Sequence, residues 1–172
     1  MKALLFALTP LVFHLHAIAA DDIFDAARNN DTIFIRQYVA TGKNIDTTDN
    51  KGYSPLILAC YDNNIAAVKQ LLKAGANSNI QDHSGNTALM GVAFKGYADI
   101  ADLLIRYRAD INIQNYNQAS ALIFAATFGQ EAVVKLLIAH GAEKDSKDRF
   151  GYTALEHARM QGNEDIVKLL QP

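Results

Sequence analysis

Residues 49–79 read DNKGYSPLILACYDNNIAAVKQLLKAGANSN, and the same pattern returns along the chain at a fixed interval. The leucine at position 56 recurs every 33 residues, as Leu89, Leu122 and Leu155. One interval before position 56 lies Ile23, so a first unit exists that lacks the opening turn. A fixed period of this length is typical of a solenoid, in which each unit packs only against its neighbours. The sequence therefore predicts five stacked units.

Each unit is predicted to contain a turn followed by two short helices. The turn at residues 49–52 ends in a glycine, which adopts a positive φ at little cost. Ser54 and Pro55 form a typical helix start, a hydroxyl cap followed by a proline in the first turn. Residues 68–72 place apolar side chains at i, i+3 and i+4, and Gly75 is suited to end that second helix. Neither helix can bury its apolar stripe alone, so the units must stack.

The openings Asp-x-x-Gly-x-(Ser/Thr)-(Pro/Ala)-Leu and closing runs such as residues 71–79 and 137–142 resemble ankyrin repeats. The resemblance covers nearly all of residues 20–172. It implies an all-α solenoid of five helix-turn-helix units joined by short β-hairpin-like turns. The expected units span about residues 20–48, 49–81, 82–114, 115–147 and 148–172.

The units depart from the family pattern at several positions. The opening tetrapeptide usually ends in histidine, but here that position holds Ile57, Met90, Ile123 and Glu156, so the usual inter-repeat histidine bonds are not expected. Gln118 replaces the turn glycine of the fourth unit, and Arg108 replaces the helix-ending glycine of the third. Each replacement should cost about 1 kcal/mol if the backbone keeps a left-handed conformation there.

Residues 1–19 have the layout of a cleaved secretory signal peptide. Lys2 precedes an apolar stretch, and small residues at 17–20 precede the acidic pair Asp21-Asp22, which predicts cleavage after Ala19. Pro10 and two histidines interrupt the apolar run, so a stable membrane anchor is not expected. The alternative is that this segment forms a buried first helix of the fold. The single lysine indicates a bacterial signal and a periplasmic location, with secretion as the alternative.

Composition excludes several classes of function. The chain has 16 Lys and Arg against 18 Asp and Glu, a formal net charge of -2 and no basic run, so nucleic acid is not an expected partner. Cys60 is the only cysteine, which excludes an internal disulfide and a four-cysteine zinc site. Because the 33-residue interval aligns Cys60 with Ala27 and Ala93, it should be a buried small apolar residue.

No catalytic motif with a specific spacing occurs in the sequence. A phosphate-binding P-loop, a Gly-x-Ser-x-Gly elbow and a His-Glu-x-x-His pair are all missing. Beyond the predicted signal peptide, His83, His140 and His157 fall in different units and are expected on the surface, so they should not form a metal site. The sequence predicts a non-enzymatic protein with no cofactor.

The resemblance implies that the turn tips and the exposed side of each first helix form one concave surface. Mapped onto this sequence, that surface is rich in aromatic residues, which dominate protein-binding hot spots. We call it the concave surface, and its predicted protein-binding residues are Lys51, Tyr53, Tyr61, His83, Asn86, Phe94, Lys95, Tyr116, Asn117, Phe128, Arg149, Phe150, Tyr152 and Met160. Some of these rings could instead pack between units.

Such a surface suits a folded protein partner, because an open groove buries too little of a small molecule. The favoured hypothesis is a protein that is monomeric when unbound and binds a periplasmic partner, as an immunity-type inhibitor of a hydrolase or toxin. One alternative is a scaffold that protects a stress enzyme such as a catalase. Another is a secreted effector that binds a host protein.

Overall fold

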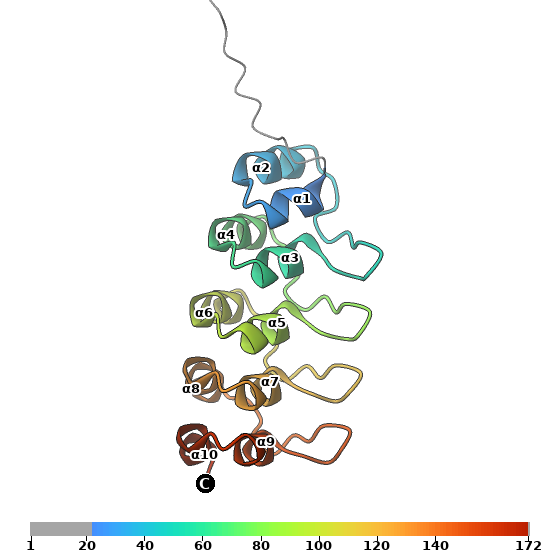
Figure 1. The fold of residues 1–172 in the computed structure, drawn as a ribbon. Coiled ribbons are helices and arrows are strands. Elements are labelled where there is room, and N and C mark those ends of the chain that lie inside the picture. Colours follow the sequence, from blue (N-terminus) through green and yellow to red (C-terminus); the bar gives the residue numbers. More distant parts are fainter. Residues whose placement is uncertain (1–21, 172) are drawn as a thin grey trace, which may run out of the picture.

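The computed structural model describes residues 22–171, and the predicted signal peptide at residues 1–19 lies outside them. The described residues form five helical hairpins (Figure 1). Their helices are α1 (Ile23–Arg28), α2 (Thr32–Ala40), α3 (Pro55–Tyr61), α4 (Ile65–Lys73), α5 (Ala88–Lys95), α6 (Ala98–Arg106), α7 (Ala121–Thr127), α8 (Glu131–Ala139), α9 (Ala154–Met160) and α10 (Glu164–Leu170). The prediction of five helix-turn-helix units in an all-α solenoid is confirmed.

The hairpins stack in chain order, one layer on the next (Figure 1). The odd-numbered helices α1 to α9, which we call the inner helices, lie in one column. The even-numbered helices α2 to α10, the outer helices, lie in a second column beside it, on the left in Figure 1. The loops that precede α3, α5, α7 and α9 project from the inner column, away from the outer helices. Among the described residues, no helix has both the length and the apolar character needed to cross a bilayer.

One continuous apolar core runs through the stack, and it follows the 33-residue interval. Leu56, Leu89 and Leu122 of the inner helices are 1–2% exposed, and their equivalents on the outer helices are fully buried. Those outer-helix equivalents are Leu71, Leu104 and Leu137. In the last unit Leu155 is only half-buried, because no further layer covers it. Stability therefore comes from contacts between neighbouring layers, as expected of a solenoid.

Polar side chains fix the ends of the inner helices and tie the layers together. The hydroxyls of Ser54, Thr87, Ser120 and Thr153 each accept a hydrogen bond from the backbone amide three residues later, which caps α3, α5, α7 and α9. Between layers, the Asn64 side chain donates to the carbonyls of Ala27 (2.9 Å) and Arg28 (2.7 Å). These bonds satisfy carbonyl groups at the end of α1 that the helix itself leaves free.

The projecting turns are held by hydrogen bonds within each turn and between turns. The Asp82 carboxylate accepts from the amides of Ser84 and Asn86, both at 2.8 Å, and Asp49, Asn115 and Asp148 do the same in their turns. The three later tips also donate a backbone amide to the preceding turn, as Tyr116 does to Ser84 at 3.2 Å. The turns therefore form the expected hairpin-like row.

The two non-glycine replacements keep the left-handed backbone. Arg108 has φ 65° and Gln118 has φ 58°, close to the values of Gly75 (90°) and Gly85 (79°) at the equivalent positions one unit earlier. The packing of the neighbouring units thus imposes the conformation despite the steric cost of a side chain.

Candidate functional site: the concave surface

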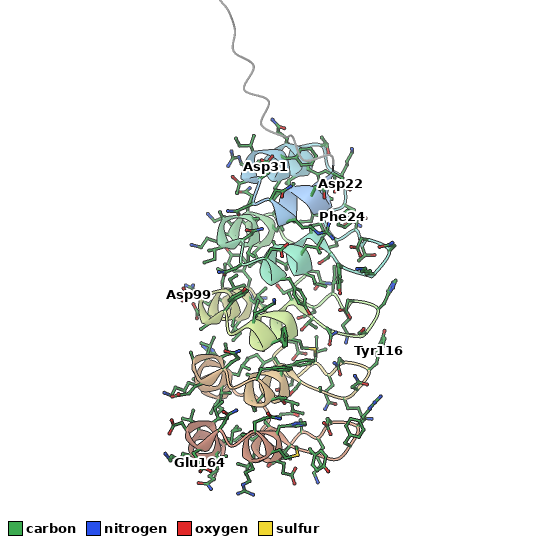
Figure 2. The ribbon with its side chains drawn as sticks, in the orientation of Figure 1. Asp22, Phe24, Asp31, Asp99, Tyr116 and Glu164 are labelled. Atoms are coloured by element: carbon green, nitrogen blue, oxygen red, sulfur yellow. The ribbon has the colours of Figure 1, made fainter. Side chains whose placement is uncertain are left out.

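The predicted binding residues lie on the loop side of the stack, opposite the exposed side of the outer helices. Figure 2 shows Tyr116 at a turn tip on one edge and Asp99 and Glu164 of the outer helices on the other. None of the predicted residues is buried. Among the predicted residues, the most exposed large apolar side chains are Tyr116 (73%), Phe150 (67%), Met160 (55%), Phe128 (47%) and Tyr152 (43%). Lys51, His83, Lys95, Asn117 and Arg149 are also exposed, while Tyr53, Tyr61, Asn86 and Phe94 are half-buried.

Tyr53 and Tyr61 pack against the edge of the core and lie close to each other, and Phe94 contacts Phe128. The Tyr53 and Tyr61 ring centroids are 6.1 Å apart, and the edge of one ring meets the face of the other in the Phe94–Phe128 pair, at 4.5 Å. Burial raises the pKa of Tyr61, and nearby Tyr53 and Asp82 raise it further, so its hydroxyl stays protonated near neutral pH. The rings form a fixed apolar strip along the inner helices.

A small apolar hollow of about 200 Å³ opens in this strip, and we call it the Gly91 pocket. It spans three units, since its walls come from α3, α5 and α7. The residues that line it are Tyr61, Asn86, Met90, Gly91, Phe94, Phe124 and Phe128. The sequence analysis did not predict Met90, Gly91 or Phe124 as part of a site. The signal was present in the sequence, because Gly91 occupies the position that holds Leu58 one unit earlier and Phe124 one unit later.

Two cations on the concave surface lie over aromatic rings. The Lys95 ammonium is 5.6 Å from the centroid of Phe94, and the Arg149 guanidinium is 4.6 Å from the centroid of Phe150. Within residues 22–171 neither cation is in a salt bridge. Both therefore keep hydrogen-bond donors free for a partner.

The cysteine and the histidines of the described residues do not form a reactive site. Cys60 is fully buried, and burial raises the pKa of its thiol far above neutral, which makes it inert as a nucleophile. His83 and His140 are exposed as expected, but the surface prediction was wrong for His157, whose Nε2 lies 2.8 Å from the Asp148 carboxylate in a partly buried pair. Residues 22–171 contain no cluster of ligating side chains that could hold a metal ion.

The sequence matches the family model described as ankyrin repeats (3 copies) over residues 23–115 and again over residues 89–172. The chain belongs to the ankyrin-repeat family. Ankyrin repeats are generally protein-binding modules, and proteins built from them are typically non-enzymatic. A comparison with curated protein sequences gave no match. In this ankyrin-repeat protein the concave surface joins exposed rings, a small apolar pocket and two free cations, features that suit contact with another protein.

Proposed function

We propose that this ankyrin-repeat protein binds a folded protein in the periplasm and inhibits it, as an immunity-type partner of a hydrolase or toxin. It performs no chemistry of its own and is monomeric until it binds. The observation that carries the proposal is the exposure of large aromatic side chains at positions that the fold does not need. Tyr116 and Phe150 at the turn tips are 73% and 67% exposed.

The rigidity of the turns supports tight binding. Each turn is fixed by a carboxylate or amide side chain and by a backbone bond to its neighbour, such as that from the Arg149 amide to Asn117 at 2.9 Å. A surface that is already ordered loses little conformational entropy when it binds. A rigid surface of this kind can block the active site of an enzyme without changing its own shape.

The periplasmic location rests on residues 1–19 alone, which lie outside the described residues. It is tested by expressing the full chain and determining the N-terminal residue of the protein in each cell fraction. A chain that begins at Ala20 in the periplasmic fraction is expected. An uncleaved chain in the cytoplasmic fraction would contradict export.

Partner binding is tested by affinity purification from a periplasmic extract with three baits. One is the wild-type protein, and one carries Tyr116→Ala, Phe128→Ala and Phe150→Ala. The matched control carries Lys69→Ala, Arg106→Ala and Lys135→Ala, which truncate exposed residues of three outer helices. We expect a protein that the wild type and the control capture and the ring variant loses. Equal capture by all three baits would refute the concave surface as the binding site.

The role of the complex is tested with the captured enzyme itself. Its activity is assayed with increasing amounts of the ankyrin-repeat protein, with the ring variant as the control. A fall in activity that saturates at one equivalent is expected for an inhibitor. Unchanged initial activity with slower inactivation would instead identify a protective scaffold and overturn the inhibitor role.

A further inference from the structure

The Gly91 pocket exists because one side chain is missing from the inner column. The equivalent positions hold Leu58, which is 5% exposed, and Phe124, which is half-buried. Gly91 lies inside α5, where glycine costs about 1 kcal/mol relative to alanine. A Cβ atom at this position would lie 2.8 Å from the ring of Tyr61, so that ring occupies part of the space. The rest of the space forms the pocket, which the fold does not require.

The size and lining of the pocket suit a single apolar side chain. Its volume of about 200 Å³ is below the range of about 300–1,000 Å³ that small-molecule sites occupy. An apolar cavity of about 150 Å³ accepts a benzene molecule, so an aromatic or branched aliphatic side chain fits. Only Asn86 and the Tyr61 hydroxyl are polar in the lining, and the Asn86 amide already pairs with Asp82 and Asn115. A charged or strongly polar group would lose its hydration there without gaining partners.

The charges at the rim favour an acidic neighbour for that side chain. Lys95 follows Phe94, a wall of the pocket, and its ammonium lies over that ring. On the same surface the Asp82 and Asp148 carboxylates are 5% and 8% exposed and accept turn amides, so a partner cannot reach them easily. Asp62, which follows α3 one unit toward the N-terminus, is an exposed carboxylate. Lys95 is therefore the charged group on α5 that a partner contacts when it fills the pocket.

We propose that the Gly91 pocket receives one apolar side chain from a segment of the partner protein that carries a carboxylate beside it, and that Lys95 binds this carboxylate. The inference rests on the proposed function and names the chemistry of the partner. The apolar side chain supplies the buried area, and the ion pair at the rim selects acidic segments over basic ones.

The test is a selection of short random peptides displayed on phage against the purified full-length protein, followed by affinity measurements. Enriched peptides should contain a large apolar residue next to Asp or Glu. Gly91→Leu adds a side chain whose Cβ would lie 2.8 Å from the Tyr61 ring, so it should displace this wall, obstruct the pocket and weaken peptide binding by about tenfold or more. Lys95→Glu should weaken binding, whereas Asp62→Lys should leave it unchanged or strengthen it.

The matched control is Lys73→Glu, which places the same charge change in the last turn of the outer helix α4, as Lys95→Glu does in α5. It should leave peptide affinity unchanged. Circular dichroism melting confirms that each variant is folded. If Gly91→Leu does not fold, Phe128→Ala removes one exposed wall of the pocket and should weaken binding instead.

Three results would overturn the inference: no enriched peptide, enriched peptides that are basic or lack apolar residues, or equal binding to the wild type and the pocket variant. Its failure is distinguishable from failure of the proposed function. If the ring variant loses the captured folded protein but Gly91→Leu keeps it, only the pocket inference fails. If peptides behave as expected but no folded protein is captured, the proposed function fails and the pocket inference stands.

Discussion

The outer helices and the concave surface use their exposed residues in different ways. Several exposed charges on the outer helices pair with each other one turn apart, as Arg106 does with Asp102 at 2.8 Å and Lys168 with Asp165 at 2.9 Å. On the concave surface, Lys95 and Arg149 lie over rings and have no carboxylate partner among the described residues. The buried apolar stripes hold the stack together, so the exposed side of the outer helices and the concave surface can carry different residues. The outer helices pair part of their charge internally, whereas Lys95 and Arg149 on the concave surface remain available for a partner.

The largest expected effect is a loss of stability from a substitution in an outer helix. Such a substitution should weaken the fold without changing binding at the concave surface. Leu104 of α6 is fully buried between layers, so Leu104→Ala should lower the free energy of unfolding by about 2–5 kcal/mol. Equilibrium urea unfolding measures this. Partner affinity per folded molecule should stay unchanged. A loss of less than about 1 kcal/mol would contradict the assignment of α6 to the core.

A second effect concerns the turn that presents Phe150 and Tyr152. Asp148 accepts from the amides of both residues and from His157, so Asp148→Ala should cost about 1–3 kcal/mol by leaving these donors unpaired. Thermal unfolding monitored by circular dichroism measures the change. Asp145→Ala, which truncates an exposed carboxylate three residues earlier in the chain, is the control and should change stability much less.

The same carboxylate makes stability depend on pH. Burial opposes ionisation of Asp148, but hydrogen bonds from the Tyr152 amide and from His157 outweigh it and lower its pKa. A lowered pKa in the folded state means that the contribution is complete above the ordinary value of about 3.9 and is lost as pH falls through the folded value. The stability difference between wild type and Asp148→Asn should therefore shrink below about pH 4. A difference that grows on acidification would contradict this sign.

A third effect compares the third and fourth units at the left-handed position that follows the outer helix, which is an arginine in one unit and a glycine in the other. Arg108 is left-handed where Gly141 stands one unit later, so Arg108→Gly should raise the unfolding free energy by about 0.5–1 kcal/mol. The reverse change, Gly141→Arg, should lower it by a similar amount, because a Cβ there would meet no atom within 4 Å and only the backbone resists. Changes of the same sign in both variants would show that side-chain contacts, not φ, decide stability here.

The smallest effect is expected for the ion pairs of the outer helices. Arg106 and Asp102 are 64% and 39% exposed, so Asp102→Ala should change stability by no more than about 0.5 kcal/mol. Urea unfolding at low and high salt checks this, and any difference should vanish at high salt. A loss comparable to that of Leu104→Ala would mean that the outer charges help to hold the stack.

Much of the fold was predictable because it repeats. The 33-residue interval located the buried leucines, and the hydroxyl caps of the inner helices followed from local chemistry. The burial of Cys60 followed from its alignment with alanines. The rings of the concave surface are exposed or half-buried, because the register decides which side of the inner helix faces outward.

Features that depend on how side chains from different parts of the stack meet were not predictable, because the repeat pattern treats each position separately. The Gly91 pocket requires Tyr61 of the preceding unit and Phe124 of the following unit to leave space around a missing side chain. The partly buried His157 requires a carboxylate nine residues earlier to turn toward it. Side-chain rotamers set both, and the repeat pattern does not specify them.

The most direct test of the central claim measures fold and binding on the same protein. The variant with Tyr116→Ala, Phe128→Ala and Phe150→Ala is compared with the wild type by urea unfolding and by affinity for the captured partner. The unfolding free energy should fall by less than about 2 kcal/mol, since two of these rings are mostly exposed and Phe128 mainly loses its contact with Phe94. The affinity should fall by about a hundredfold or more. An unchanged affinity together with a fall in stability as large as that of Leu104→Ala would show that the rings serve the fold and not a partner.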